Sequence, residues 1–115
     1  MVGKIKVIIK RPDEKYGHVT NISTTLENLQ KTVDGPIETL TVAPGVVLVV
    51  NEEGKLREDL IPNFKIWSDI EALGFSVHDV IYGTVIVLGV DGEEFADVPI
   101  SFSQWKRLLL EWGNY

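Results

Sequence analysis

Cysteine is missing from this chain of 115 residues. Without a thiol the protein can form no disulfide bond, use no cysteine nucleophile and bind no zinc through cysteine. A chain without disulfides suits a reducing compartment, so we expect a cytoplasmic protein. Apolar runs are also short, because none approaches the roughly 18 residues that cross a bilayer. We therefore expect neither a membrane-spanning segment nor a membrane partner.

Positive charge is scarce as well. The chain has 11 lysine and arginine residues against 17 aspartate and glutamate residues, which gives a net charge of −6. Affinity for nucleic acid comes largely from basic side chains that neutralise phosphates, so nucleic acid is not an expected partner. Hydrophobic residues make up 44% of the chain, as in ordinary folded proteins. The length suits one core, and we expect a single domain over residues 1–115.

Patterns that carry catalytic or metal chemistry are not found. The histidines, His18 and His78, lie outside any metal-ligand spacing such as His-Glu-x-x-His. Gly54-Lys55 resembles the end of a phosphate-binding loop, but Leu56 follows where that motif needs serine or threonine for magnesium. The sequence therefore predicts no catalytic residue, no metal site and no cofactor, and we expect a protein that is not an enzyme.

The chain does contain a set of strand patterns. Residues 4–10, KIKVIIK, follow a period of two, and residues 46–50 are wholly apolar, which is typical of a strand covered on both faces. Pro44-Gly45 and Asp91-Gly92 predict tight turns. The strands that we expect cover residues 4–10, 18–23, 37–42, 46–50, 80–90 and 93–101.

Three capping boxes predict helix starts. Thr24 with Glu27 precedes apolar residues at helical spacing that end at Gly35, and Ser101 with Gln104 precedes a second such run. The third box, at residues 68–71, indicates a short helix before residue 74. The element order favours an α+β fold, in which two or three helices pack on a mainly antiparallel or mixed sheet of about six strands.

The C-terminal helix carries an apolar stripe. Phe102, Trp105, Leu109 and Trp112 share one helical face. We favour the interpretation that this face packs on the sheet, with Trp105 buried and Trp112 nearer the edge. The alternative is an interaction surface for self-association or for a protein partner, because tryptophan is enriched at binding hot spots. That surface would consist of Trp105, Leu109 and Trp112.

Four segments of the chain resemble a known family. TLENLQKTVDGPIETL, VVLVVNEEGKL, IPNF and IYGTVIVLG together resemble small bacterial proteins of unknown function, found mainly in phages, plasmids and integrated mobile elements. The chain departs from the family pattern where Gly35 is followed directly by Pro36. The resemblance implies an accessory protein of a mobile element with no assigned activity, and no catalytic residue is carried over from it.

The polar segment NEEGK, residues 51–55, has two interpretations. It is favoured as the turn of a β-hairpin, which needs little beyond Gly54 and one asparagine. The alternative is a ligand site at one end of the sheet, built from Asn51, Glu52, Asn63 and Thr84. The leading functional hypothesis is an accessory protein that binds a host protein. Its rival is a small-molecule or nucleotide-binding domain that uses this polar site.

Overall fold

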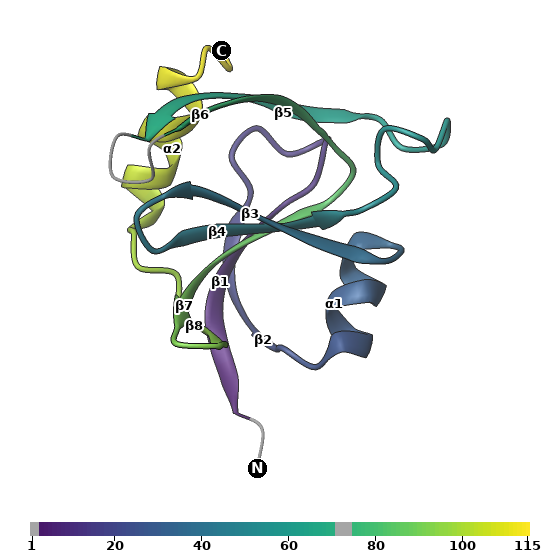
Figure 1. Ribbon diagram of the computed structural model, residues 1–115, viewed down its shortest axis with the longest axis vertical. Coiled ribbons are helices and arrows are strands. Elements are labelled where there is room, and N and C mark those ends of the chain that lie inside the picture. The colour runs from purple at the N-terminus through teal and green to yellow at the C-terminus, as the bar shows by residue number, and fades with distance from the viewer. Residues whose placement is uncertain (1–2, 71–74) are drawn as a thin grey trace.

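Alternating and wholly apolar segments form most of the strands in the computed structural model. The structure describes residues 3–70 and 75–115, and it describes their side chains except at residues 68–77. Eight strands and two helices lie in this part of the chain, and the α+β class is confirmed (Figure 1). In chain order they are β1 (Lys4–Lys10), β2 (His18–Ser23), α1 (Leu26–Val33), β3 (Ile37–Ala43), β4 (Val46–Asn51), β5 (Pro62–Ile70), β6 (Phe75–Tyr82), β7 (Val85–Asp91), β8 (Glu94–Ala96) and α2 (Phe102–Glu111).

The larger sheet is antiparallel throughout. Its order is β2-β1-β7-β4-β3, and β8 pairs with the C-terminal end of β7. β4 lies between β7 and β3, and all of its residues are buried. The expectation of a strand covered on both faces is therefore confirmed. The pairing of Asp91 with Glu94 also confirms the tight turn predicted at Asp91-Gly92.

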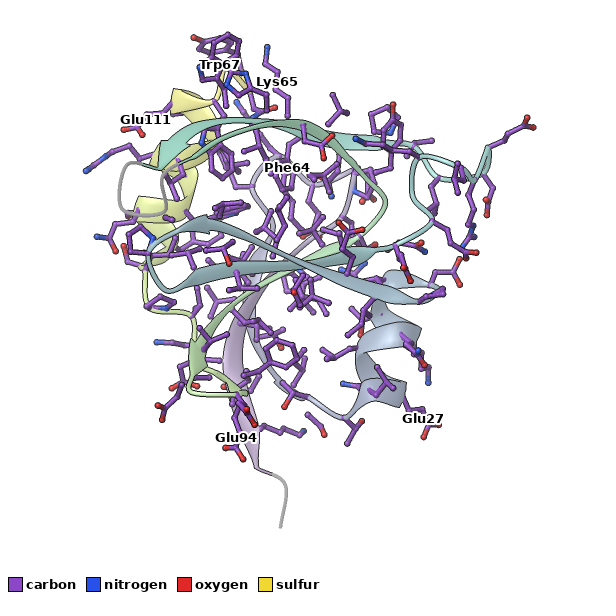
Figure 2. The ribbon with its side chains drawn as sticks, viewed as in Figure 1. Glu27, Phe64, Lys65, Trp67, Glu94 and Glu111 are labelled. Atoms are coloured by element: carbon purple, nitrogen blue, oxygen red, sulfur yellow. The ribbon has the colours of Figure 1, made fainter. Side chains whose placement is uncertain are left out.

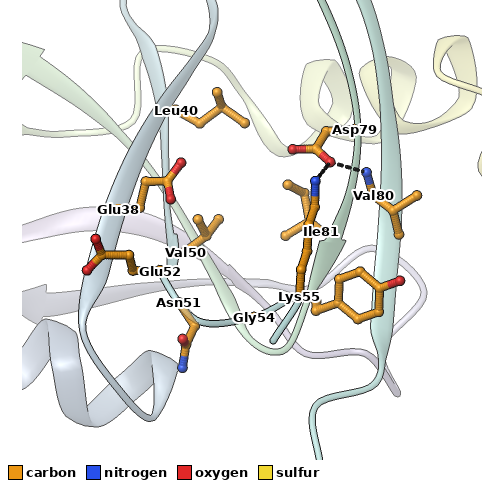
Figure 3. A pocket seen from close by; sticks show the side chains of 11 residues that line it. Glu38, Leu40, Val50, Asn51, Glu52, Gly54, Lys55, Asp79, Val80 and Ile81 are labelled. Carbon is orange, nitrogen blue, oxygen red and sulfur yellow. Dashed lines mark hydrogen bonds and ion pairs between the residues drawn. The ribbon is translucent and has the colours of Figure 1, made fainter. Parts of the chain in front are cut away.

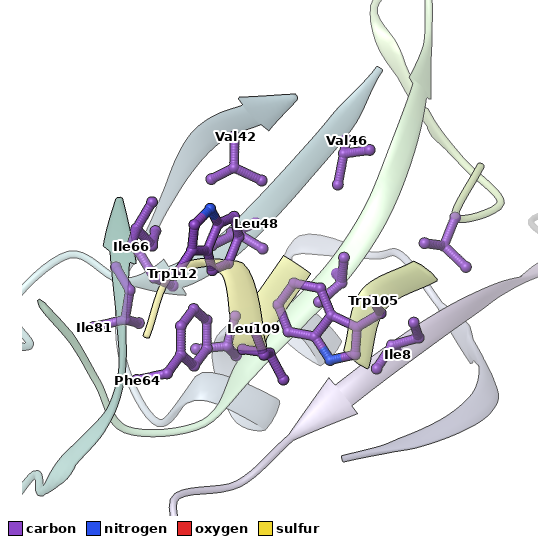
Figure 4. Packing of buried hydrophobic residues seen from close by; sticks show 14 residues of the cluster. Ile8, Val42, Val46, Leu48, Phe64, Ile66, Ile81, Trp105, Leu109 and Trp112 are labelled. Atoms are coloured by element: carbon purple, nitrogen blue, oxygen red, sulfur yellow. The ribbon is translucent and has the colours of Figure 1, made fainter. Parts of the chain in front are cut away.

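Each face of the larger sheet has its own layer of cover. One face packs against α1 through apolar side chains that include Leu29, Val33, Val47 and Val49. The other face lies under α2 and the second sheet, which is the hairpin β5–β6 (Figure 1). Phe64 joins these two covering elements, since its ring centroid lies 5.6 Å from that of Trp105 and 6.1 Å from that of Trp112 (Figure 4).

One predicted strand is in fact two. We expect a single strand over residues 80–90, whereas the chain turns at Gly83 and separates β6 from β7. Gly83 has a φ of 78°, in the left-handed region that glycine adopts without strain. The turn carries the chain from the hairpin β5–β6 into the larger sheet, where β7 pairs with β1 and β4.

The short helix expected at residues 68–74 is wrong over its described part. Ser68 lies in β5 opposite Val77 of β6, so it caps no helix. Residues 71–74 lie outside the described part of the chain. The strand pattern of residues 64–67, FKIW, outweighs the isolated capping box because Phe64 and Ile66 fill the core.

The capping box of α2 is confirmed. Ser101 Oγ accepts a hydrogen bond from Gln104 N at 3.1 Å, and Gln104 Oε1 accepts one from Ser101 N at 2.8 Å. Neither α1 nor α2, the helices of the described residues, is long and apolar enough to cross a membrane.

Two elements differ in extent from those expected. The cap of α1 is Thr25, one residue later than predicted, and its Oγ1 accepts from Asn28 N at 3.2 Å. The strand expected at residues 93–101 is limited to β8. Asp97 ends it, because the Asp97 Oδ1 turns to accept a hydrogen bond from Lys6 N at 2.8 Å.

Candidate functional site

The NEEGK segment is the first part of the connection between the two sheets. β4 pairs with β3 and β7, whereas β5 pairs with β6, so residues 52–61 lead from the larger sheet to the hairpin. Backbone hydrogen bonds from Gly54 N to Asn51 O (3.1 Å) and from Leu56 N to Glu53 O (2.9 Å) make the segment a turn. The prediction of a hairpin is wrong, because the strands on either side belong to different sheets.

Asn51 is 5% exposed and holds the end of α1. Its Nδ2 donates to the carbonyl oxygens of Val33 and Asp34, each at 3.1 Å, and its Oδ1 accepts from Glu53 N at 2.7 Å. Carbonyl groups in the last turn of a helix have no partner within the helix, so this amide caps the C-terminus of α1. A side chain expected to bind a ligand is thus engaged inside the protein.

Asn63 joins three segments of the chain. Its Nδ2 donates to Lys10 O and Gly83 O, both at 2.8 Å, and its Oδ1 accepts from Lys10 Nζ at 2.5 Å. Lys10 is 3% exposed, and its Nζ also donates to Glu14 O at 2.7 Å. Burial lowers the pKa of Lys10, while the charges of Glu14 and Asp13 oppose that change. Sequence reasoning missed this lysine, because the strand pattern does not distinguish it from the exposed lysines of β1.

The four predicted ligand residues gather at one end of the larger sheet without forming one site. The register of β4 with β7, continued by two residues, places Asn51 opposite Thr84, which is half-buried. Asn51 and Glu52 line one cleft, whereas Asn63 lines a different hollow. Thr84 lines neither of these two hollows.

The cleft that contains Asn51 and Glu52 opens between β3 and β4 on one side and β6 on the other (Figure 3). We call it the β3–β6 cleft, and its volume is about 130 Å³. Its apolar lining consists of Leu40, Val50, Val80 and Ile81, with Gly54 beside them. Its polar lining consists of Glu38, Asn51, Glu52, Lys55, Asp79 and Tyr82.

Lys55 lines the β3–β6 cleft. Its Nζ forms an ion pair with Asp79 Oδ1, which ties the NEEGK turn to β6 (Figure 3). The hydrogen bond to Asp79 raises the pKa of Lys55, burial opposes this rise, and the charges of Asp79, Tyr82 and Glu38 add to it. The charged ammonium form is therefore favoured in the cleft. The Lys55 side chain is 63% exposed, so water weakens the ion pair.

Arg57 secures the next part of the same connection. Its Nη2 donates to Asp34 Oδ2 at 2.8 Å and to Asp59 Oδ2 at 2.5 Å, and its Nη1 donates to Asp34 O. These hydrogen bonds, to Asp59 first and then to Asp34, raise the pKa of Arg57, and the same pairing lowers the pKa of Asp59. Residues 51–59 are therefore held to α1 and to β6 by their own polar contacts.

The apolar stripe of α2 lies in the core (Figure 4). Trp105, Leu109 and Trp112 are 0%, 1% and 3% exposed, and Trp105 Nε1 donates to Tyr16 O at 2.8 Å. The favoured interpretation, that this face packs on the sheet, is confirmed, although Trp112 is almost as buried as Trp105. In this structure the three side chains offer no accessible surface to a partner.

A different tryptophan is exposed. Trp67 projects from the outer side of the hairpin and is 64% exposed, whereas Phe64 of the same strand points inward (Figure 2). The ring centroids of Trp67 and His78 lie 4.3 Å apart, and the neighbouring Val80 is 40% exposed. We call the four outward residues the aromatic face, and they are Lys65, Trp67, His78 and Val80. The alternation of residues 64–67 is the sequence signal that could have predicted it.

No group of three or more histidine, aspartate or glutamate side chains in the described residues could hold a metal ion.

Comparison with known proteins gives one match. The model of a family described as Domain of unknown function (DUF3846) matches residues 5–109. No curated protein and no solved structure matches the chain. The resemblance to a family of unknown function is thereby confirmed, and the link to phages and other mobile elements stays a prediction.

Proposed function

We propose that this chain, which belongs to the family Domain of unknown function (DUF3846), is a non-enzymatic accessory protein of a phage, plasmid or other mobile element. It acts by binding a host protein. The observation that supports this proposal most directly is the aromatic face on the hairpin β5–β6. There Trp67 is 64% exposed, whereas Trp105 and Trp112 are buried in the core.

An exposed tryptophan is informative because of what it costs and what it offers. Burying a large aromatic side chain is favourable, so leaving one in water forgoes stability. The same ring supplies a large rigid contact area, and tryptophan is enriched among the residues that dominate binding energy. Trp67 is also flanked by Val80 and by the ring of His78, which together extend the apolar area.

The hairpin presents this face on a fixed support. Its inner side packs in the core through Phe64, Ile66 and Ile81, which are 4%, 2% and 5% exposed. The Asn114 side chain also binds both backbone groups of Lys65. Its Oδ1 accepts from Lys65 N at 3.0 Å, and its Nδ2 donates to Lys65 O at 2.8 Å. A surface that is already ordered loses little conformational entropy when a partner binds, which favours affinity.

The test is capture of host proteins on immobilised wild-type protein and on two variants. Trp67→Ala removes the centre of the aromatic face, whereas Leu26→Ala removes a large hydrophobic side chain that is 59% exposed on α1, the helix on the opposite face of the larger sheet. We expect a protein that is retained by the wild type and by Leu26→Ala and is lost with Trp67→Ala. Circular dichroism establishes that both variants are folded.

Sedimentation velocity of the same three proteins separates a host partner from a second copy of the chain. A wild-type dimer that becomes a monomer in Trp67→Ala would identify self-association as the function of the face. Equal capture by wild type and Trp67→Ala, with no change in sedimentation, would contradict the assignment of binding to the aromatic face.

Small-molecule binding at the NEEGK segment is a second candidate. The β3–β6 cleft supports it, because Asn51 and Glu52 lie in that cleft. Its volume of about 130 Å³ is smaller than the roughly 300 Å³ at which sites for drug-sized ligands begin. The cleft therefore suits a small group or one side chain better than a nucleotide.

A further inference from the structure

We propose that the β3–β6 cleft receives a basic side chain, lysine or arginine, of the protein that docks on the aromatic face. This inference rests on the proposed function and assigns the chemistry of the partner next to its apolar contact. The cleft supplies three features that such a side chain needs: an apolar channel, an excess of carboxylates and a border that it shares with the aromatic face at Val80.

The lining of the cleft matches the stem of a basic side chain. Val50 and Ile81 are 7% and 5% exposed, and with Leu40 they form an apolar lining between the two sheets (Figure 3). Lysine and arginine bury their aliphatic stems against apolar surface while the charged group remains among polar partners. The volume of about 130 Å³ suits a single extended side chain.

The rim of the cleft has more negative than positive charge. Glu38, Glu52 and Asp79 lie there with Lys55 as the one basic residue of the lining. Among the described residues, neither Glu38 nor Glu52 uses its carboxylate in a hydrogen bond or an ion pair. Two carboxylates are therefore available to a second cation, and this charge complementarity selects a basic partner over an acidic one.

Lys55 shows that the rim already accepts an ammonium group. Its Nζ is bound to Asp79, and the charge of Glu38 also favours its charged form. Because this ion pair is largely exposed, its contribution to stability is small, and Lys55 can move aside at little cost. An arginine of the partner can then bind Glu38 and Glu52, whether or not the ion pair between Lys55 and Asp79 is retained.

The cleft and the aromatic face share one strand. Along β6, His78 and Val80 belong to the outer face, whereas Asp79 and Ile81 lie opposite the core residues Ile66 and Phe64 of β5 and line the cleft. Val80 also borders the cleft, so the two surfaces are continuous. A partner that covers Trp67 with an apolar residue can therefore place a basic residue of the same segment in the cleft.

The experiment is a titration followed by ¹H–¹⁵N correlation spectra of the full chain. The probe is N-acetyl-arginine amide, and the controls are the neutral N-acetyl-norleucine amide and the acidic N-acetyl-glutamate amide. We expect saturable shifts of the Gly54, Leu40 and Tyr82 amide signals with the arginine probe alone. The double variant Glu38→Gln/Glu52→Gln should bind it at least about fivefold more weakly, because two attractive charges are lost.

A matched variant and a second surface variant make the result specific. Glu27→Gln/Glu58→Gln removes the same charge at exposed positions outside the cleft and should bind the arginine probe as the wild type does. Trp67→Ala should also leave probe binding unchanged, so loss of host-protein capture and loss of probe binding are separate outcomes. The inference is overturned if the norleucine probe gives equal shifts, if the arginine probe never saturates, or if both double variants weaken binding alike.

Discussion

Asn63 and Lys10 bind each other in both directions, since Lys10 Nζ donates to Asn63 Oδ1 at 2.5 Å and Asn63 Nδ2 donates to Lys10 O at 2.8 Å. These residues are 53 positions apart in the chain. The pair connects β1 of the larger sheet to β5 of the hairpin, and the second hydrogen bond of Asn63 Nδ2, to Gly83 O, adds the turn before β7. One amide thus holds together the three segments that meet where the two sheets join.

Replacing Asn63 by leucine should therefore destabilise the protein strongly. The change removes one acceptor from the buried Lys10 ammonium, and it removes the donor that Asn63 supplies to the carbonyl oxygens of Lys10 and Gly83. We expect a loss of about 2–4 kcal/mol in the free energy of unfolding, measured by urea denaturation. Asn21→Ala, at an exposed asparagine of β2, should change it by less than about 0.5 kcal/mol. Equal effects of the two changes would refute the bridging role.

The buried Lys10 also predicts how stability changes at alkaline pH. Burial lowers its pKa in the folded state below the ordinary 10.5, so the unfolded chain holds the proton more tightly. Stability contributed by this group therefore rises with pH between the lowered pKa and 10.5. The difference in unfolding free energy between wild type and Lys10→Met should move in favour of the wild type over this interval. A constant difference would show that the proton affinity of Lys10 is the same in both states.

Replacing Trp105 or Trp67 by alanine should change the free energy of unfolding by very different amounts. Trp105 is 0% exposed and Trp67 is 64% exposed. Trp105→Ala should cost about 3–5 kcal/mol of unfolding free energy, or prevent folding, because it leaves a large cavity beside Phe64 and Trp112. Trp67→Ala should change it by less than about 0.5 kcal/mol. A well-folded, stable Trp105→Ala variant would mean that α2 does not close the core.

Nucleotides and zinc should not stabilise the protein. The β3–β6 cleft is small, and the Asn51 and Asn63 amides are engaged in internal hydrogen bonds. A ligand raises Tm only to the extent that it binds the folded state. We expect the Tm in thermal unfolding to be the same with and without ATP and magnesium, and with and without zinc. A saturable rise with ATP would favour the small-molecule candidate over protein binding.

The elements that sequence patterns predicted are those whose signal lies within a few consecutive residues. The capping box at Ser101 and the apolar stripe of α2 each involve residues a few positions apart. The wholly apolar run of β4 indicates by itself that this strand is buried. The break at Gly83 was missed because a glycine within an apolar run indicates equally a strand interior or a turn. Its left-handed conformation is required by the separation of the two sheets, which no local pattern contains.

The roles of the polar residues were missed for a related reason. Asn51 caps a helix that lies 18 positions earlier, and Asn63 binds a lysine 53 positions earlier. An asparagine that satisfies distant backbone groups has the same local appearance as one that faces a ligand. The exposure of Trp67 was missed although apolar and polar residues alternate along its strand. The capping box at Ser68 predicted a helix at this point, and a helix conceals the alternation.

The route of the chain between β4 and β7 separates the outward surface of the hairpin from the larger sheet. These two strands pair directly with each other, and residues 52–84 leave the larger sheet after one and return at the start of the other. The hairpin is thus an insertion whose two ends lie on adjacent strands of the larger sheet. Along it, inward residues pack in the core, whereas outward residues are exposed. Substitutions on the outward side of these two strands can therefore change the surface of the protein without changing its core.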